Sequence, residues 1–330
     1  MCVVRRKVLC ALLRCKVSKI VGIINGFGGK NGVFSFFCSI FVANMELMTH
    51  IDIPVSEWKM EAGAKVLLVG SCFADEVGKR MLRGGFEAMV NPFGTLYNPA
   101  SIAENLEMCL RGEDCADDVI FQGRDGLWHS WMHHSCFSSS EREVLLAAVE
   151  RVRREVAAFL KEADVLIVTF GTAVIYRLKE DGMLVANCHK MPDGLFERER
   201  MSVACIVERW RLLLERMKGV NPKLKVVLTV SPIRHKRDGF HANQVSKGIL
   251  LQAVDELAGE HAYFPSYELM MDELRDYRFY ADDMIHPSEK AVEYIWQRFQ
   301  DVYMDGRTRD AVAKSRKEWA RQQHRPIVRA

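Results

Sequence analysis

Two short segments of the sequence hold side chains that together could perform nucleophilic catalysis. The first reads Gly70-Ser71-Cys72-Phe73-Ala74. In the second, far along the chain, Asp283 lies three residues before His286. A hydroxyl nucleophile, an imidazole base and a carboxylate that orients the base are the parts of a Ser-His-Asp hydrolytic site. We therefore expect Ser71, His286 and Asp283 to meet in space as nucleophile, base and acid.

Other assignments of these residues stay open. Ser71 is the preferred nucleophile because it directly follows the glycine at the end of a predicted strand, but serine is also a common helix cap. Cys72 is a second candidate nucleophile, since a helix N-terminus favours a thiolate. Asp282 is a weaker candidate for the acid than Asp283, because it lies four residues before His286 rather than three.

The elements that must position these residues follow an alternating pattern of strands and helices. Continuous apolar runs, typical of strands buried on both faces, predict strands at residues 65–69, 165–170, 225–230 and 261–264. Helical periodicity predicts helices at residues 141–163, 202–217, 243–257 and 288–302. The alternation indicates an α/β fold, a three-layer α/β/α sandwich with a mainly parallel sheet. Ligands bind at the carboxyl ends of such strands, where Ser71 is expected.

Charge and cysteine content exclude several classes of protein. The formal net charge is +3, but seven Lys and Arg residues and no acid lie in residues 1–44, which leaves about −4 for the remainder. This mildly acidic body argues against a nucleic-acid surface. The ten cysteines include no Cys-x-x-Cys pair, so the spacing typical of zinc-binding or redox-active cysteines is absent. We expect free thiols and a cytoplasmic location.

Three regions are predicted along the chain. Residues 1–44 are basic and then apolar, and the apolar run at 33–43 is shorter than the ~20 residues of a membrane span. We expect this region to be a non-native extension, or alternatively a signal-like segment of an exported protein. Residues 45–305 are expected to form one domain, beginning with a strand-like alternation at 45–54, and residues 306–330 a basic C-terminal tail.

Several ordered blocks resemble a known family. The run at residues 70–74 is the signature of the GSCFA family, and further blocks similar to that family lie at residues 91–99, 169–173, 187–192, 231–235, 243–247 and 283–287. The resemblance covers roughly residues 48–300. The family is similar to the SGNH/GDSL hydrolase superfamily, which implies a flavodoxin-like α/β/α fold. In that superfamily a Gly-Asp-Ser block holds the nucleophile and an Asp-x-x-His block holds acid and base.

The resemblance also implies an oxyanion hole. The backbone N–H groups of Ser71 and Gly94 match two of its donors. The superfamily's third block, Gly-x-Asn-Asp, supplies an asparagine amide, whereas this chain has Ala173 at that position. Losing one such donor would raise the barrier by on the order of 3 kcal/mol. The candidates to replace the missing amide are Asn98, His134, Thr172 and Asn187.

Polar residues of the expected loops above the sheet are predicted to bind substrate. Besides the four candidates just named, they are His189, Arg234 and His235. Their basic character favours a substrate that bears a carboxylate or a phosphate. The histidines, His133 included, lack the spacing of metal ligands, so we expect no metal and no cofactor.

We therefore expect a serine hydrolase of the SGNH type that acts on an ester, removing an acyl group such as acetyl from a carbohydrate or small metabolite. Two alternatives remain. An O-acyltransferase would use the same three residues, and product analysis with and without an acceptor would distinguish it. A non-catalytic binding module on the same fold is disfavoured by the presence of Ser71, Asp283 and His286 together.

Overall fold

The computed structural model describes residues 48–112 and 119–323 of the 330-residue chain. The chain divides into two units, Met1–Thr49 and His50–Ala330. Every element described below belongs to the second unit. The extension expected at residues 1–44 lies outside the described residues. None of the described helices is both long and apolar enough to cross a membrane.

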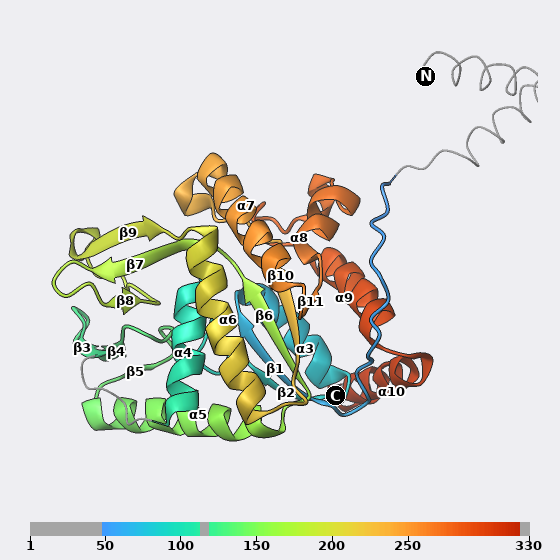
Figure 1. Ribbon diagram of the computed structural model, residues 1–330, viewed down its shortest axis with the longest axis horizontal. Helices are drawn as coiled ribbons and strands as arrows, with labels where there is room; N and C mark the ends of the chain where they lie inside the picture. The colour runs from blue at the N-terminus through green and yellow to red at the C-terminus, as the bar shows by residue number, and fades with distance from the viewer. Residues whose placement is uncertain (1–47, 113–118, 324–330) are drawn as a thin grey trace, which may run out of the picture. The chain divides into compact units, whose positions relative to one another are not determined.

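A five-stranded parallel sheet forms the centre of the second unit (Figure 1). Its strand order is β2 (Glu87–Val90), β1 (Lys65–Gly70), β6 (Val165–Phe170), β10 (Lys225–Val230) and β11 (Ala262–Tyr263). In chain order this is 2-1-3-4-5, the flavodoxin-like arrangement, and its direction reverses between β1 and β6. The predicted α/β fold with a mainly parallel sheet is confirmed.

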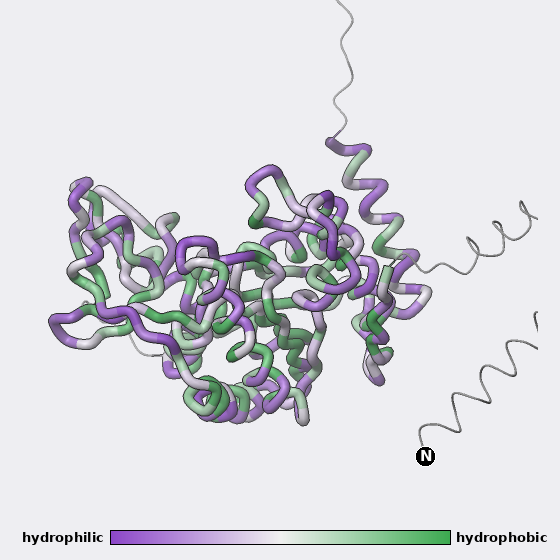
Figure 2. Tube along the Cα trace, turned by 90° about the horizontal axis from the view of Figure 1, so that it is seen from above, coloured by the Kyte–Doolittle hydropathy of each residue, from purple (hydrophilic) through white to green (hydrophobic). Residues whose placement is uncertain are grey.

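Helices cover both faces of this sheet (Figure 1). One face packs against α4 (Pro99–Arg111), α5 (Arg142–Glu162), α6 (Val203–Val220) and α7 (Phe240–Leu257). The other packs against α3 (Cys72–Arg83), α9 (Glu289–Tyr303) and α10 (Gly306–Gln323). Along β1, Leu67 faces the first layer and Leu68 the second, both fully buried. The strands read as continuous apolar runs because both faces are covered, and Figure 2 shows hydrophobic segments concentrated in the centre.

Polar caps at the helix starts explain where the helices begin. Ser71 accepts a hydrogen bond from Phe73 N at the start of α3, and Ser288 accepts one from Ala291 N at the start of α9. Such a cap satisfies a backbone donor that has no partner within the helix, and stabilises it by about 1 kcal/mol. The helices predicted at 141–163, 202–217, 243–257 and 288–302 are present within a few residues of those bounds.

Several elements were not predicted. β2 and α4 are two of them, and six more strands form two small antiparallel sheets. One sheet joins β3 (Ile120–Gln122), β4 (Trp128–Ser130) and β5 (Ser138–Ser139), and the other joins β8 (Leu184–Val185), β7 (Val174–Leu178) and β9 (Phe196–Arg200). Strands of two to five residues are too short for a clear periodic signal.

The strand-like alternation expected at residues 45–54 forms no strand in its described part, residues 48–54. Its backbone polar groups pair with side chains instead. Ile51 N donates to Glu273 Oε1 at 2.6 Å, and Arg298 donates to Ile51 O at 2.5 Å. An extended segment thus lies against α9 without joining a sheet.

The junction after β1 imposes a strict requirement on Gly70. Its φ is +137°, and a Cβ there would lie 2.2 Å from Thr169 O.

We expect Gly70→Ala to lower the free energy of unfolding by about 2–4 kcal/mol, through backbone strain and this clash. The control is Gly248→Ala in α7, where a Cβ meets nothing within 4 Å. It should raise stability by up to about 1 kcal/mol. Urea denaturation measures both variants, and equal losses would contradict the prediction.

Candidate active site

The loops that follow β1, β2, β6 and β10 meet at the carboxyl edge of the sheet. The loop after β2 crosses the ends of two strands. Leu96 N donates to Gly70 O at 2.9 Å, and Gly171 N donates to Tyr97 O at 2.7 Å. The strand order reverses between β1 and β6, and open α/β sheets bind their ligands at such a point.

Asp283 and His286 form a close pair on the turn before α9. His286 Nδ1 lies 2.6 Å from Asp283 Oδ2, while Asp283 Oδ1 accepts hydrogen bonds from the backbone N–H of His286 at 2.9 Å and of Ile285 at 2.8 Å. The bonds from the backbone and ring of His286, together with that from Ile285, lower the pKa of Asp283 to about 2. An ionised carboxylate holds the proton of the ring on Nδ1, which leaves Nε2 free to accept one.

The partner of that free nitrogen is a thiol. His286 Nε2 lies 3.5 Å from the Sγ of Cys72, the first residue of α3. No hydrogen bond among the described residues joins His286 to Ser71, whose Oγ accepts from Phe73 N at 3.3 Å. The structure therefore brings the predicted base and acid together, and it puts Cys72 rather than Ser71 beside the base.

The surroundings of Cys72 keep its thiol protonated at neutral pH. Burial, followed by the negative charge of Asp75, raises the pKa of Cys72 to about 11. The S–H can then donate to His286 Nε2. The backbone N–H of Cys72, at the first position of α3, has no acceptor within the helix, and a helix N-terminus stabilises nearby negative charge.

A buried polar network fixes the backbone before Ser71 and Cys72. Asn91 Oδ1 accepts a hydrogen bond from Gly70 N at 2.8 Å, and its Nδ2 donates to Asp75 at 2.7 Å. Thr95 Oγ1 donates to the other Asp75 oxygen at 3.2 Å. Asn91 has a φ of +41°, which few residues other than glycine, asparagine and aspartate adopt. Sequence reasoning assigned no role to this network, although Asn91 and Thr95 lie in a family-like block.

The oxyanion donors differ from expectation. Ser71 N donates to Thr169 O at 3.1 Å, and Gly94 N donates to Asn91 O at 2.7 Å. Each predicted donor already has a backbone acceptor, so neither N–H is free to hold an oxyanion in this geometry. Gly94 has another reason to be glycine, because its φ is +74° and a Cβ would lie 2.2 Å from His134 Cβ.

Each candidate for the missing amide makes a hydrogen bond to another part of the fold. Asn98 caps α4 by accepting from Ser101 N at 2.8 Å, and the Thr172 hydroxyl lies 3.0 Å from Ser246 Oγ. Asn187 donates to Ser135 Oγ at 3.2 Å. The fourth candidate, His134, accepts from Cys136 N at 3.4 Å. No hydrogen bond among the described residues joins any of the four to Cys72, Asp283 or His286.

His189 belongs to a different part of the fold. Its Nε2 donates to Ser130 O at 2.8 Å, and its ring packs on His129 and Phe121 beside the sheet formed by β3, β4 and β5. Within residues 48–112 and 119–323, no three His, Cys, Asp or Glu side chains cluster as a metal site requires.

His235 and Lys247 lie under the site. Lys247 is 1% exposed, and its Nζ donates to Gly171 O and Ser231 O, each at 2.7 Å. Burial lowers the pKa of Lys247 to about 7. Burial, and then the charges of Lys247 and His286, lower the pKa of His235 to about 4. The buried Nε2 of His235 has no protein hydrogen-bond partner.

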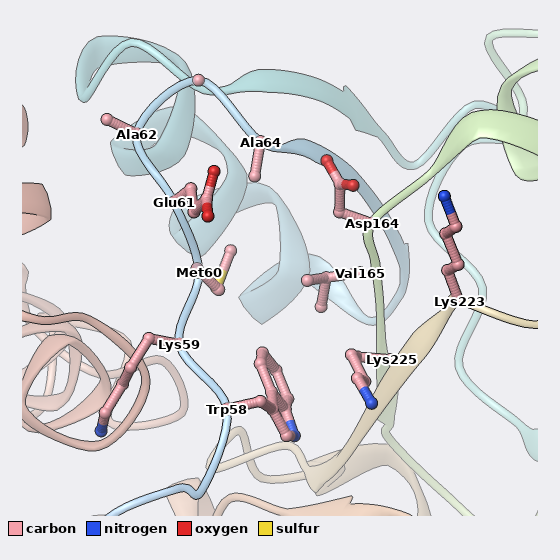
Figure 3. Close-up of a pocket in the computed structure, with 11 residues that line it drawn as sticks. Trp58, Lys59, Met60, Glu61, Ala62, Ala64, Asp164, Val165, Lys223 and Lys225 are labelled. Atoms are coloured by element: carbon pink, nitrogen blue, oxygen red, sulfur yellow. The ribbon is translucent and has the colours of Figure 1, made fainter.

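The opposite edge of the sheet also holds a cavity, of about 450 Å³ (Figure 3). Ala64, Asp164 and Lys225 in its wall lie at the amino ends of β1, β6 and β10. Cys72 follows the carboxyl end of β1. This cavity therefore lies away from the Cys72–His286–Asp283 group and is not part of the candidate active site.

Comparisons with known proteins give one family and several distant folds. The model of the GSCFA family matches residues 65–299, and no curated protein matches the chain. Among solved structures, a GDSL-like lipase candidate from Parabacteroides merdae is 13% identical, with a TM-score of 0.39 over 75% of this chain and 98% of the other. A family 3 carbohydrate esterase from Talaromyces cellulolyticus is 10% identical, with a TM-score of 0.34 over 76% and 99%.

The Asp283 carboxyl should titrate at about pH 2, below its ordinary 3.8. Because the folded pKa is lowered, its contribution to stability is present above the ordinary pKa and is lost as pH falls through about 2. His286→Ala removes the ring donor but keeps the two backbone donors, so the midpoint should rise only part of the way to 3.8. Carbon-13 NMR measures this midpoint, and no change in the variant would contradict the observed pairing.

Proposed function

The chain belongs to the GSCFA family, and from the geometry of its site we propose that it is an acyl-ester hydrolase with Cys72 as nucleophile. His286 is the general base, and Asp283 orients it. The observation that carries this proposal is the continuous chain of contacts from Cys72 Sγ to His286 Nε2 at 3.5 Å and from His286 Nδ1 to Asp283 Oδ2 at 2.6 Å.

The choice of Cys72 over Ser71 has a second support. In the Gly-Asp-Ser block of the SGNH/GDSL superfamily, the nucleophile stands two residues after the glycine. Cys72 has this position relative to Gly70. Ser71, between them, is 1% exposed and caps α3. A buried cap has less access to a substrate carbonyl than the partly exposed residue that follows it.

The first half of the reaction forms a thioester. As Cys72 Sγ attacks the carbonyl carbon, His286 Nε2 takes the thiol proton, and the charge of Asp283 stabilises the resulting imidazolium. Because burial raises the pKa of Cys72 to about 11, the thiol is not ionised beforehand and depends on the base at the moment of attack. Collapse of the tetrahedral intermediate breaks the C–O bond, and His286 returns the proton to the leaving alcohol.

The second half releases the acid. A water molecule gives a proton to His286 and attacks the thioester carbonyl. The C–S bond then breaks, and His286 returns the proton to Cys72 Sγ, which restores the thiol. The His286 and Asp283 side chains are 47% and 44% exposed, so water can reach the base directly. This access favours hydrolysis over transfer of the acyl group to another alcohol.

Two groups of the site suit the negative charge that develops on the carbonyl oxygen. One is the backbone N–H of Cys72 at the start of α3, aided by the helix dipole. The other is His235 Nε2, which is buried, has no protein partner and is close enough to His286 to feel its charge. We assign these two as donors in place of Gly94 and of the absent asparagine.

The resemblance to the superfamily favours an oxygen ester of a carbohydrate or small metabolite as substrate. A thiol nucleophile requires a compartment in which it stays reduced, which agrees with the expected cytoplasmic location. The five cysteines among the described residues are all free thiols.

Substitutions at the two adjacent residues test the nucleophile. Cys72→Ala should reduce kcat/KM for a short aryl acetate by about 1000-fold or more, because it removes the attacking atom. Ser71→Ala should keep activity within about tenfold and lower stability by about 1 kcal/mol, through loss of the cap. Steady-state kinetics and urea denaturation measure these effects. Full activity in Cys72→Ala together with no activity in Ser71→Ala would show that Ser71 is the nucleophile.

The nature of the reaction can be tested by product analysis. With an acetyl ester and an added sugar acceptor, we expect free acetate and alcohol in equal amounts, because water reaches His286 directly. Chromatography of the products, with and without the acceptor, measures the ratio. An acetylated sugar that increases with acceptor concentration, while free acetate falls, would identify an acyltransferase.

A further inference from the structure

We propose that a cavity beside the catalytic turn binds an anionic group, a carboxylate or a phosphate, on the alcohol portion of the substrate. The proposal rests on the acyl-ester hydrolase function above and names the class of its substrate. The cavity has a volume of about 380 Å³ and lies between the loop after β10, α7 and residues 266–280. Its polar wall includes Arg234, Gln244, Asp272 and Arg275.

This cavity shares a structural element with the catalytic pair. Arg234 in its wall donates from its backbone N to Ile285 O at 3.3 Å, directly before His286. The other end of the same turn is closed by Ala281 N, which donates to His286 O at 2.8 Å. The residue after Arg234 is His235, whose ring packs edge-on against Tyr97 at 5.4 Å. A substrate whose ester lies at His286 thus has the cavity next to it.

The charge of the cavity suits an anion. Arg234 and Arg275 have no ion pair among the described residues, whereas Arg278 and Arg298 nearby pair with Asp276 and Glu273. Asp272 is the one carboxylate in the cavity wall, against two guanidinium groups. The guanidinium groups of Arg234 and Arg275 are therefore available to pair with an anionic ligand.

The Arg234 side chain is held in one orientation by aromatic rings. Its guanidinium lies 4.2 Å from the ring centre of Tyr280 and 5.8 Å from those of Tyr277 and Phe240. Arg234 Nη1 donates one hydrogen bond, to Met284 O at 3.5 Å on the turn that carries His286. A guanidinium stacked on an aromatic face presents its remaining edge N–H groups to a ligand, and these match a carboxylate or phosphate. Gln244 accepts a hydrogen bond from Tyr267 at 2.6 Å through Oε1, so its amide N–H₂ is a further donor.

The far wall of the cavity is a rigid segment with unusual geometry. Met270, Met271 and Asp272 belong to a π-helix, Leu269–Glu273. Such wide turns are rare and often occur at functional sites. Glu273 at its end is fully buried and accepts hydrogen bonds from Arg298 at 2.6 Å and Tyr294 at 2.7 Å. These bonds hold the wall in place before any ligand binds.

Matched aryl acetates test the proposal. The probes are 4-acetoxybenzoate, 4-acetoxyphenyl phosphate and the neutral 4-acetoxybenzamide. The wild-type enzyme should prefer an anionic probe to the neutral one by about tenfold in kcat/KM, because a hydrogen bond to a charged group contributes a free energy of about this size. Arg275→Gln should reduce this preference to near one, and Arg275→Glu should reverse it. Whichever anionic probe is preferred identifies carboxylate or phosphate as the ligand group.

A control and a binding measurement separate this proposal from the proposed function. Arg278→Gln makes the same charge change outside the cavity wall and should retain the anion preference. Calorimetry with Cys72→Ala should show tighter binding of 4-hydroxybenzoate or 4-hydroxyphenyl phosphate than of 4-hydroxybenzamide. Selective binding without ester turnover by the wild type would refute the hydrolase and keep the anion site. Equal binding of all three ligands, or an unchanged preference in Arg275→Gln, would overturn the anion site.

Discussion

A single buried guanidinium group holds together the two helices on which the candidate active site depends. Arg80 is 2% exposed and contacts Glu76 of its own helix α3, together with Glu289 and Glu293 of α9. Cys72 is the first residue of α3, and His286 lies three residues before the first residue of α9. Because its three carboxylate partners lie on both helices, the Arg80 guanidinium links α3 to α9. Arg80 thus connects the helices that carry the proposed nucleophile and base, which lie over 200 residues apart in the sequence.

A second buried cation has the same role on the sheet. Lys247 joins the carboxyl ends of β6 and β10 through Gly171 O and Ser231 O, and its aliphatic stem is enclosed in the core. Burial lowers the pKa of Lys247 to about 7, so the group carries positive charge close to Cys72 only in its protonated form, which a Cys72 thiolate would favour. The site thus combines an uncharged thiol in the resting state with a nearby charge that favours the thiolate once His286 takes the proton.

Much of the scaffold could be predicted from local pattern. Residues 165–170 and 225–230 are strands over their whole predicted length, because strands covered on both faces are apolar throughout. β2 was missed because it is four residues long and partly exposed, and the two antiparallel sheets because their strands depend on pairing partners that no local pattern reveals. The same limit applied to His189: its residue type suggested substrate binding, whereas tertiary contacts place its ring against His129.

The sequence by itself determined the chemical groups available to the site: a hydroxyl, a thiol, an imidazole and a carboxylate in recognisable blocks. Only the tertiary structure decided which neighbour faces the base. At a strand-to-helix junction successive side chains point in different directions, so Ser71 turns inward to cap α3 while Cys72 reaches His286 Nε2. Likewise, no local pattern related Arg275 to Arg234. They share a cavity because the chain returns across the carboxyl edge of the sheet, and contacts between distant segments are set by the packing of the whole fold.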